Sequence, residues 1–504
     1  MNERLRAICD LSVSAAREFV GLHDYDGRVQ DLSLEGVRAG LARLGGPPLD
    51  DALDEANVTA HEHALTVELG ELEMHRRNPL LHLDELDLSC YDREYASDEQ
   101  RAEARRRHLA SWPEAIDAAV ATLDRVSTVV AAALLPAVRG LPAGLAPTDP
   151  LAARALAAHA RLVEHIERCS LHGEPDPALG RSNLERLLGA KEAMPVDLGR
   201  LEERADAERD RLRALLADAC DRLAPGRPSA QVVDELARDH PDPGGVLEEA
   251  RAVTAEVITF TREHELVPNL DGECLVGPSP PSRRWALAMM SWAAPYEDDA
   301  PSRYYITPPD PDWPSEEQEQ WLRVFSRSSL PAITVHEVAP GHFAHGRCLR
   351  RVTGDARRTL HSAAFAEGWA HYVEELCLEE GFRAGDPSFA VGVAVDALRR
   401  VTRLAVSIGL HSGTMNVDEA VARFTADAFI AGSAARAEAA RATFDPTYGR
   451  YTWGKLEILA LRDRARAAWG PRYSHGSFHA ALLRLGSPPL GLIEHALNGG
   501  VAIS

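Results

Sequence analysis

Residues 331–375 constrain the fold of this chain more than any other segment, because their sequence requires two helices with a break between them. An apolar run ends in His336-Glu337, and a second histidine, His342, comes six residues after the first. At about 100° per residue, a continuous helix would point the two imidazoles roughly 240° apart. Pro340 removes a backbone donor, and Gly341 can adopt dihedral angles closed to other residues. We therefore predict an interruption at Pro340-Gly341, where a widened turn returns His342 towards His336.

The second half of this segment is predicted to form one helix with a polar stripe. In LHSAAFAEGWAHYVEEL the apolar residues recur at helical spacing. Glu367, His371 and Glu374 stand at i, i+4 and i+7 and share one face. Such a stripe is either a solvated face or a buried site, and the preceding histidines favour the buried site.

Four of these residues, His336, Glu337, His342 and Glu367, have the composition of a zinc site of the metallopeptidase type. They supply two imidazoles, one ligating carboxylate and one free carboxylate, which is the set needed for zinc-activated hydrolysis. Their spacing differs from H-E-x-x-H, in which both histidines lie on one helical face. The alternative is a helix that ends at Pro-Gly and contains histidines without any metal.

Motifs along the C-terminal part of the chain resemble a known family. In order, they are HEVAPGH, AEGWAHYVEEL, RRVTRLAVSIGLHSGTMNVDEAV, YTWGKLEILALR and SFHAALLRLGSPPLGLIEHAL, within residues 300–495. Together they resemble the bacterial domain of unknown function 885 (DUF885) family, whose members are similar to zinc peptidases of the gluzincin type. The resemblance implies that His336, His342 and Glu367 bind Zn²⁺ and that Glu337 is the general base.

One position departs from the family pattern. The family commonly has His-His-x-Gln after the first motif, whereas this chain has His342-Phe343-Ala344-His345. Any role of the missing second histidine and glutamine is therefore not carried over, and His345 becomes an additional candidate.

The expected mechanism assigns roles to several further residues. Glu337 would take a proton from water and deliver it to the leaving amine. Tyr451 is the first choice for stabilising the oxyanion, with His371 or His411 as alternatives. Glu374 and His371 would orient the metal ligands from behind.

Three residues are candidates for binding the substrate, namely Arg462, Tyr305 and His411. Arg462, in the family's Leu-Arg position, suits bidentate binding of a carboxylate, which would make the enzyme carboxypeptidase- or dipeptidase-like. Its alternative is an ion pair with one of the chain's many acids. Tyr305, next to Arg303 and Tyr304, would line a cleft, or else serve in edge packing.

The composition favours a mainly α fold, because aromatic residues are only 6% and alanine and leucine are abundant. Strands are expected only at 271–276, 284–292 and 303–307. We expect a large helical body, zincin-like by the resemblance, with a small β element near the metal site. An N-terminal helical region, 1–265, would pack with a metal-binding catalytic region, 266–504, as one compact body with a cleft.

Charge and cysteine content restrict the partners and the compartment. The 77 acidic and 55 basic residues give a formal charge of −22, which disfavours a nucleic-acid surface. The seven cysteines contain no C-x-x-C pair, and the first nineteen residues lack a continuous apolar run, so we expect a cytoplasmic protein. The most apolar run, 116–138, contains charged residues, so no membrane span is expected. The sequence does not indicate an oligomeric state.

The sequence thus predicts a zinc-dependent hydrolase that cleaves peptide (amide) bonds, with a peptide or small amide as its substrate. One alternative is a zinc amidohydrolase acting on a small metabolite, since the same chemistry cleaves any activated amide. Another is a non-catalytic helical binding protein whose metal is structural or absent. Glu337 favours catalysis, because a structural site needs no free carboxylate beside its ligands.

Overall fold

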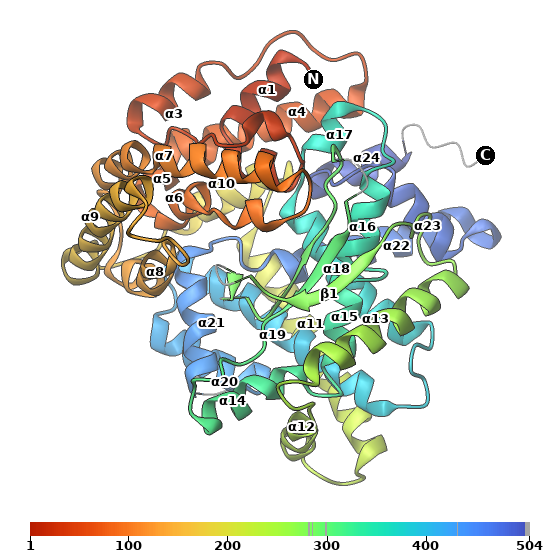
Figure 1. Ribbon diagram of the computed structural model, residues 1–504. Coiled ribbons are helices and arrows are strands. Elements are labelled where there is room, and N and C mark those ends of the chain that lie inside the picture. Colours follow the sequence, from red (N-terminus) through yellow and green to blue (C-terminus); the bar gives the residue numbers. More distant parts are fainter. Residues whose placement is uncertain (281–282, 285, 298–299, 431, 499–504) are drawn as a thin grey trace.

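The computed structural model describes residues 1–280, 283–284, 286–297, 300–430 and 432–498. Helices dominate the described chain and a small three-stranded sheet accompanies them, so the mainly α prediction is confirmed. In Figure 1 the helices α1–α10 gather in the upper and left parts of the molecule, and α15, α18 and α19 lie near the middle. Among the described residues, no helix is both long and apolar enough to cross a membrane.

The N-terminal half is a succession of helices joined by short turns. Its α-helices are α1 (Glu3–Asp10), α2 (Val13–Glu18), α3 (Leu34–Leu41), α4 (Ala52–Leu65), α5 (Met74–Arg77), α6 (Pro79–Leu86), α7 (Asp98–Thr122), α8 (Thr128–Gly140), α9 (Pro150–His172), α10 (Arg181–Glu192), α11 (Leu198–Leu223), α12 (Ser229–Arg238) and α13 (Val246–Glu263). Short 3₁₀ segments η1 (His23–Tyr25) and η3 (Ser89–Asp92) and a π-helical segment η2 (Thr66–Glu71) lie between them.

The C-terminal half begins with the sheet and continues as helices. These are α14 (Ser315–Leu322), α15 (Leu330–Glu337), α16 (His342–Leu349), α17 (Asp355–Thr359), α18 (Ala363–Glu379), α19 (Pro387–Ser412), α20 (Val417–Ala428), α21 (Gly432–Phe444), α22 (Arg450–Trp469), α23 (His475–Leu483) and α24 (Leu490–Asn498), with 3₁₀ turns η5 (Arg323–Phe325) and η6 (Gly470–Arg472).

Each strand of the sheet overlaps one of the three segments in which strands were predicted, with β1 displaced towards the C-terminus. Strands β1 (Cys274–Pro278), β2 (Ala288–Ser291) and β3 (Ser302–Ile306) have the order β1-β3-β2. Strand β3 pairs in parallel with β1 and antiparallel with β2. Position 285 of the predicted second strand lies outside the described residues. One face of β3 contacts α15, where the Tyr304 hydroxyl lies 3.3 Å from Thr334 Oγ1, so the sheet stands directly beside this helix.

Two glycines set the distance between α18 and α22. A Cβ atom added to Gly368 would lie 2.5 Å from Gly454 Cα, and one added to Gly454 would lie 1.9 Å from the carbonyl oxygen of Ala364. No other residue type fits this crossing without displacing a backbone. The close approach brings Glu367 on α18 and Tyr451 on α22 to the same end of the helix pair.

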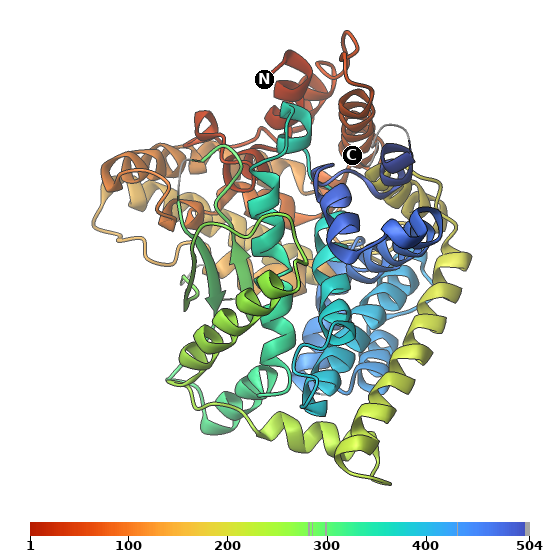
Figure 2. The same ribbon diagram turned by 90° about the vertical axis from the view of Figure 1, so that its right-hand side faces the viewer.

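The principal hydrophobic core joins most of the chain. It contains buried residues from Leu184 to Ile493, on both sides of the predicted boundary at residue 265. A separate core lies among the N-terminal helices, from Leu83 to Ile166. Figure 2 shows the side view, in which the sheet lies next to the α13 helix and the N-terminal helices form the upper part of the molecule. The division at residue 265 stays a prediction.

Candidate metal centre

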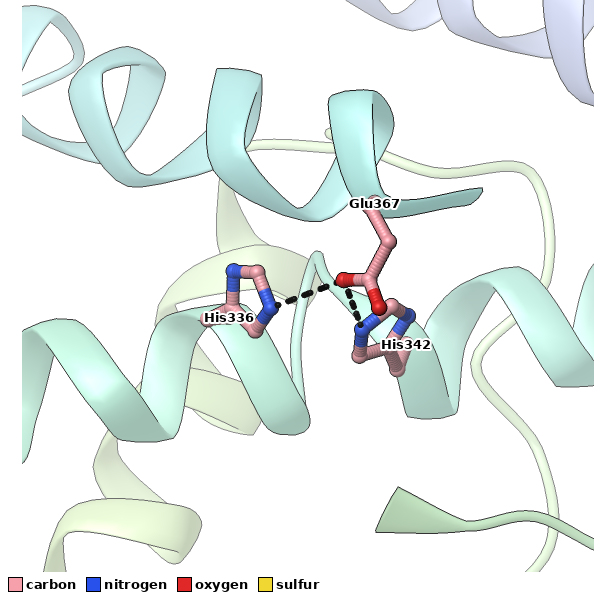
Figure 3. Close-up of side chains that lie close together, drawn as sticks. All are labelled: His336, His342 and Glu367. Carbon is pink, nitrogen blue, oxygen red and sulfur yellow. Dashed lines mark ion pairs between the residues drawn. The ribbon is translucent and has the colours of Figure 1, made fainter. Parts of the chain in front are cut away.

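The fold brings His336, His342 and Glu367 together from three different helices. His336 lies in the last turn of α15, His342 begins α16, and Glu367 lies in the second turn of α18. One ligand atom from each of the three lies within 4.8 Å of the other two. Glu367 Oε2 is 3.5 Å from His336 Nε2 and 3.3 Å from His342 Nε2, and Figure 3 shows the carboxylate pointing between the two rings.

The predicted break between the two histidines is present. Helix α15 ends at Glu337, and the Gly341 amide donates to the carbonyl oxygen of Val335 at 3.2 Å, a bond across six residues. A second bond of the same span runs from Ala344 to Val338 at 3.1 Å. A Cβ atom on Gly341 would lie 1.9 Å from the carbonyl oxygen of His336, so only glycine fits this widened turn.

The three side chains fit a zinc ion. Two ligands about 2.1 Å from a tetrahedral zinc lie about 3.4 Å apart, close to the two separations between Glu367 and the histidines. Glu367 Oε2 is buried and has no hydrogen-bond partner among the described residues. A buried, unpartnered carboxylate oxygen is costly unless a cation compensates it. Both the donor set and the orphaned oxygen therefore suit a metal.

Electrostatics within this group favour the ionised carboxylate. Burial alone would raise the pKa of Glu367, but the adjacent imidazoles of His336 and His342 hold it well below its usual range. The pKa of His336 is raised to about 9, because its contacts with Glu367 and Glu374 outweigh burial and the charge of Arg400. Without a metal, positively charged imidazole thus balances the carboxylates, and a metal must displace that proton to bind.

A buried carboxylate holds His336 from behind. Glu374 Oε1 lies 2.6 Å from His336 Nδ1, and Arg400 Nη1 donates to Glu374 Oε2 at 2.7 Å. Burial would raise the pKa of Glu374, but the Arg400 guanidinium and His371 lower it. An ionised Glu374 accepts the Nδ1 proton of His336, so the proton that a metal must displace is the one on Nε2, which faces Glu367.

His371 lies one step further from the ligands. Its Nδ1 is 3.4 Å from Glu374 Oε2, and the residue is only 1% exposed. Burial lowers the pKa of His371 to about 4, so the ring is neutral at pH 7. From this location His371 can act on the ligands only through Glu374. It has no hydrogen bond or ion pair with His336, His342 or Glu367.

Glu337 follows the ligand His336 at the end of α15, and Tyr451 approaches His336 from α22. Glu337 is partly exposed and has no ion pair or hydrogen bond with any described residue. Its charge contributes to the raised pKa values of Cys274 and Tyr304, which burial mainly causes, so it faces the sheet. The ring of Tyr451 stacks near His336, with centroids 6.3 Å apart and an interplanar angle of 27°.

Three other candidate residues have hydrogen-bond or ion-pair partners other than the three ligands, and a fourth, Tyr305, lies on the sheet. Arg462 Nη1 donates to Glu379 at 2.7 Å, which is the ion-pair alternative weighed for it. His411 Nε2 bonds the carbonyl oxygen of Ala442, and His345 Nε2 lies 2.9 Å from Ser487 Oγ. Tyr305 follows Tyr304 on β3, so its side chain points to the face of the sheet opposite α15.

The sequence reasoning missed the arginines of this centre. Arg400 contacts Glu374, and the guanidinium carbons of Arg400, Arg403 and Arg450 lie 6.0, 5.4 and 5.3 Å from the Tyr451 ring centroid. The signal was present in RRVTRL, where Arg400 and Arg403 are three residues apart and share a helical face. No spacing rule joins them to Tyr451, which is about fifty residues later in the chain.

Comparisons with known proteins give the family and the fold. Residues 15–497 match the family described as "Bacterial protein of unknown function (DUF885)". A solved "putative lipoprotein of unknown function" from Shewanella oneidensis superposes with a TM-score of 0.76 at 20% identity, covering 97% of this chain and 96% of that one. A "putative lipoprotein" from Colwellia psychrerythraea gives 0.78 at 16% identity, covering 98% and 97%. No curated protein matches.

Proposed function

This chain belongs to the DUF885 family of bacterial proteins, and from that premise we propose that it is a zinc-dependent hydrolase of peptide or other amide bonds. One observation carries the proposal: an orphaned carboxylate oxygen of Glu367 lies 3.3 and 3.5 Å from two imidazole nitrogens. Because Glu374 fixes the proton of His336 on Nδ1, the Nε2 atom is prepared as a ligand.

The three ligands leave a further coordination position, as catalytic zinc sites do. A zinc ion held by His336, His342 and Glu367 would supply Lewis-acid chemistry, polarising an amide carbonyl and activating water near neutral pH. Everything else in the reaction falls to side chains of this chain.

Glu337 is proposed as the general base. It is adjacent in sequence to the ligand His336, and its carboxylate has no hydrogen-bond or ion-pair partner among the residues that the structure describes. Its oxygen would accept a proton from water and later donate that proton to the leaving nitrogen. A purely structural metal site would have no use for this free carboxylate, which favours catalysis over the binding-protein alternative.

Tyr451 is proposed to donate its hydroxyl to the carbonyl oxygen as negative charge develops there. Its ring lies against His336, within 6.0 Å of three guanidinium carbons. A hydroxyl donor surrounded by positive charge stabilises an oxyanion more than a neutral carbonyl, which is the condition for accelerating the reaction.

The proposed partners are a peptide or a small amide, with no nucleic acid and no membrane. The charge of −22 supports the absence of a nucleic-acid partner. We propose a cytoplasmic location, supported by seven cysteines that form no disulfide. The description "putative lipoprotein" belongs to the two solved relatives, and we do not extend it to this chain.

The test combines metal analysis with a cleavage screen of the purified protein. We expect one zinc per chain, and we expect His336→Ala and Glu367→Ala each to lose it. Glu337→Gln should keep the metal and lose roughly a thousandfold or more in turnover, because an amide cannot accept the proton. Glu316→Gln, at an exposed position on α14, is the matched control for the loss of a carboxylate. Full zinc occupancy in both ligand variants would refute the proposed centre.

A further inference from the structure

Four arginines surround the two tyrosines next to the candidate metal centre. Arg400, Arg403 and Arg450 approach the ring of Tyr451, and the Arg441 guanidinium carbon lies 4.6 Å from the ring centroid of Tyr448. Among the described residues, these arginines form ion pairs with three carboxylates, namely Glu374, Glu438 and Asp445. Two of the four arginines, Arg441 and Arg450, therefore share a single ion-pair partner, Asp445.

Two of the arginines are fully engaged. Arg400 donates to Glu374 at 2.7 Å, and Arg403 forms a bidentate pair with Glu438 at 2.8 and 2.6 Å. Both are buried, with side chains 10% and 14% exposed. Their role is to hold Glu374 and the tyrosines in place.

The other two arginines share one acid and keep donors free. Arg450 directs all its hydrogen bonds through Nη1, to Asp445 at 2.8 and 2.9 Å and to Thr447. Arg441 has only a contact of 3.9 Å between its Nε and the same Asp445, and no hydrogen bond to a described residue. The Arg441 side chain is 36% exposed, so its guanidinium is open to a ligand.

The beginning of α22 adds positive potential at the same place. This helix of 20 residues starts at Arg450, and Gly449 before it offers no side chain to cap it. A Cβ atom on Gly449 would lie 2.3 Å from Leu404 Cδ1, so packing excludes a capping side chain here. The N-terminus of a long helix attracts anions through its free amides and its dipole.

We propose that Arg441 and Arg450 bind a carboxylate of the substrate, next to the amide that is cleaved. This inference rests on the proposed function and specifies its substrate class, namely amides that carry a free carboxylate close to the scissile bond, such as the C-terminal end of a peptide. The free Nη atoms of the two guanidinium groups suit the planar, bidentate geometry of a carboxylate. Arg462, which already pairs with Glu379, does not take this role.

The place of the pair relative to Tyr451 supports this assignment. The Arg450 guanidinium carbon is 5.3 Å from the centroid of the ring whose hydroxyl is proposed to meet the carbonyl oxygen. Burial lowers the pKa of Arg450, but the charges of Asp445, Tyr451 and Glu367 raise it, so Arg450 lies close to the Glu367 carboxylate. A carboxylate held by Arg450 therefore lies beside the proposed reaction centre.

The experiment compares N-acetylated dipeptides as free acids and as C-terminal amides. Hydrolysis is measured on the wild type, Arg441→Gln and Arg450→Gln, and binding is measured by calorimetry on the zinc-loaded Glu337→Gln protein with and without each arginine change. We expect the wild type to prefer free acids roughly ten- to hundredfold in kcat/KM, and each arginine variant to lose that preference. Because Arg450 also lies beside Tyr451, Arg450→Gln should slow the amides as well, whereas Arg441→Gln should slow mainly the acids. Arg423→Gln, which breaks an ion pair on α20, is the matched control.

The outcomes separate the two proposals. Hydrolysis of acids and amides at equal rates by the wild type would overturn the carboxylate site and leave the proposed function standing. Tighter binding of acids by Glu337→Gln, lost on adding Arg441→Gln, would support the site even if no dipeptide is cleaved. Loss of the preference for free acids in Arg462→Gln, with the preference kept in Arg441→Gln and Arg450→Gln, would also overturn the carboxylate site. Arg441→Lys guards against misfolding, because a lysine keeps the charge and should retain part of the preference.

Discussion

Replacing Glu374 by glutamine is predicted to weaken zinc binding although Glu374 is not itself a ligand. The carboxylate accepts from His336 Nδ1 at 2.6 Å and from Arg400 Nη1 at 2.7 Å. Glutamine has nearly the same shape and keeps one oxygen acceptor, but it removes the negative charge. The ring of His336 then loses the partner that fixes its proton on Nδ1 and makes Nε2 a stronger donor to the metal.

The size of the effect follows from this hydrogen bond. A bond to a charged group contributes about 1.5–3 kcal/mol, against about 0.5–1.5 kcal/mol for a neutral one. The loss of charge should therefore cost about 1–2 kcal/mol, which corresponds to roughly five- to thirtyfold in the zinc dissociation constant. This overlaps the range of roughly ten- to hundredfold that is usual for residues behind a metal ligand.

Glu375→Gln is the matched control, because it changes the next residue of the same helix. Glu375 also pairs with cations, the buried Lys455 at 2.5 Å and the exposed Arg211 at 2.8 Å, and it has no hydrogen bond or ion pair with any of the three ligands. Both variants leave a cation uncompensated and should lose stability. The urea concentration at the unfolding midpoint should therefore fall in both. Only Glu374→Gln should weaken zinc binding, measured by competition with a chromogenic chelator. Equal zinc dissociation constants in the two variants would refute the argument.

Three further predictions concern backbone contacts and pH. Gly341→Ala places a Cβ atom 1.9 Å from the carbonyl oxygen of His336 and should weaken zinc binding at least tenfold. Gly385→Ala is the control, because a Cβ atom there has no neighbour within 4 Å. Equal zinc affinities of the two variants would contradict the need for glycine in the turn. Gly454→Ala should lower the free energy of unfolding in urea by roughly 1–3 kcal/mol, because it forces α18 and α22 apart, and an unchanged urea midpoint would contradict this. Glu192, with its pKa raised to about 7 by burial, should contribute stability that is complete below its unfolded pKa of 4.5 and is lost as the pH rises through 7. Relative to Glu192→Gln, the wild type should therefore lose about 3 kcal/mol between pH 4 and pH 8, and parallel pH profiles of urea unfolding would refute this.

Local features of the sequence were sufficient to predict the scaffold of the centre. The interruption at Pro340-Gly341, the polar stripe of Glu367, His371 and Glu374, and the three strand segments all follow from dihedral preferences and periodicity within a few residues. These preferences are properties of the chain itself, so they were visible before any tertiary contact was known. The match to the family was likewise carried by short motifs in order along the chain.

The partners of charged and aromatic side chains could not be obtained in this way. Arg462 suits a carboxylate equally well from a substrate or from Glu379, and only the packing of α18 against α22 put Glu379 beside it. The packing of distant elements likewise decides which face of β3 carries Tyr305. It also decides that Arg441 and Arg450 share an acid. Composition and spacing specify which groups a chain has and how its helices run. The pairing of those groups across hundreds of residues is decided by close packing, which alone determines which donors keep a partner and which remain open to a ligand.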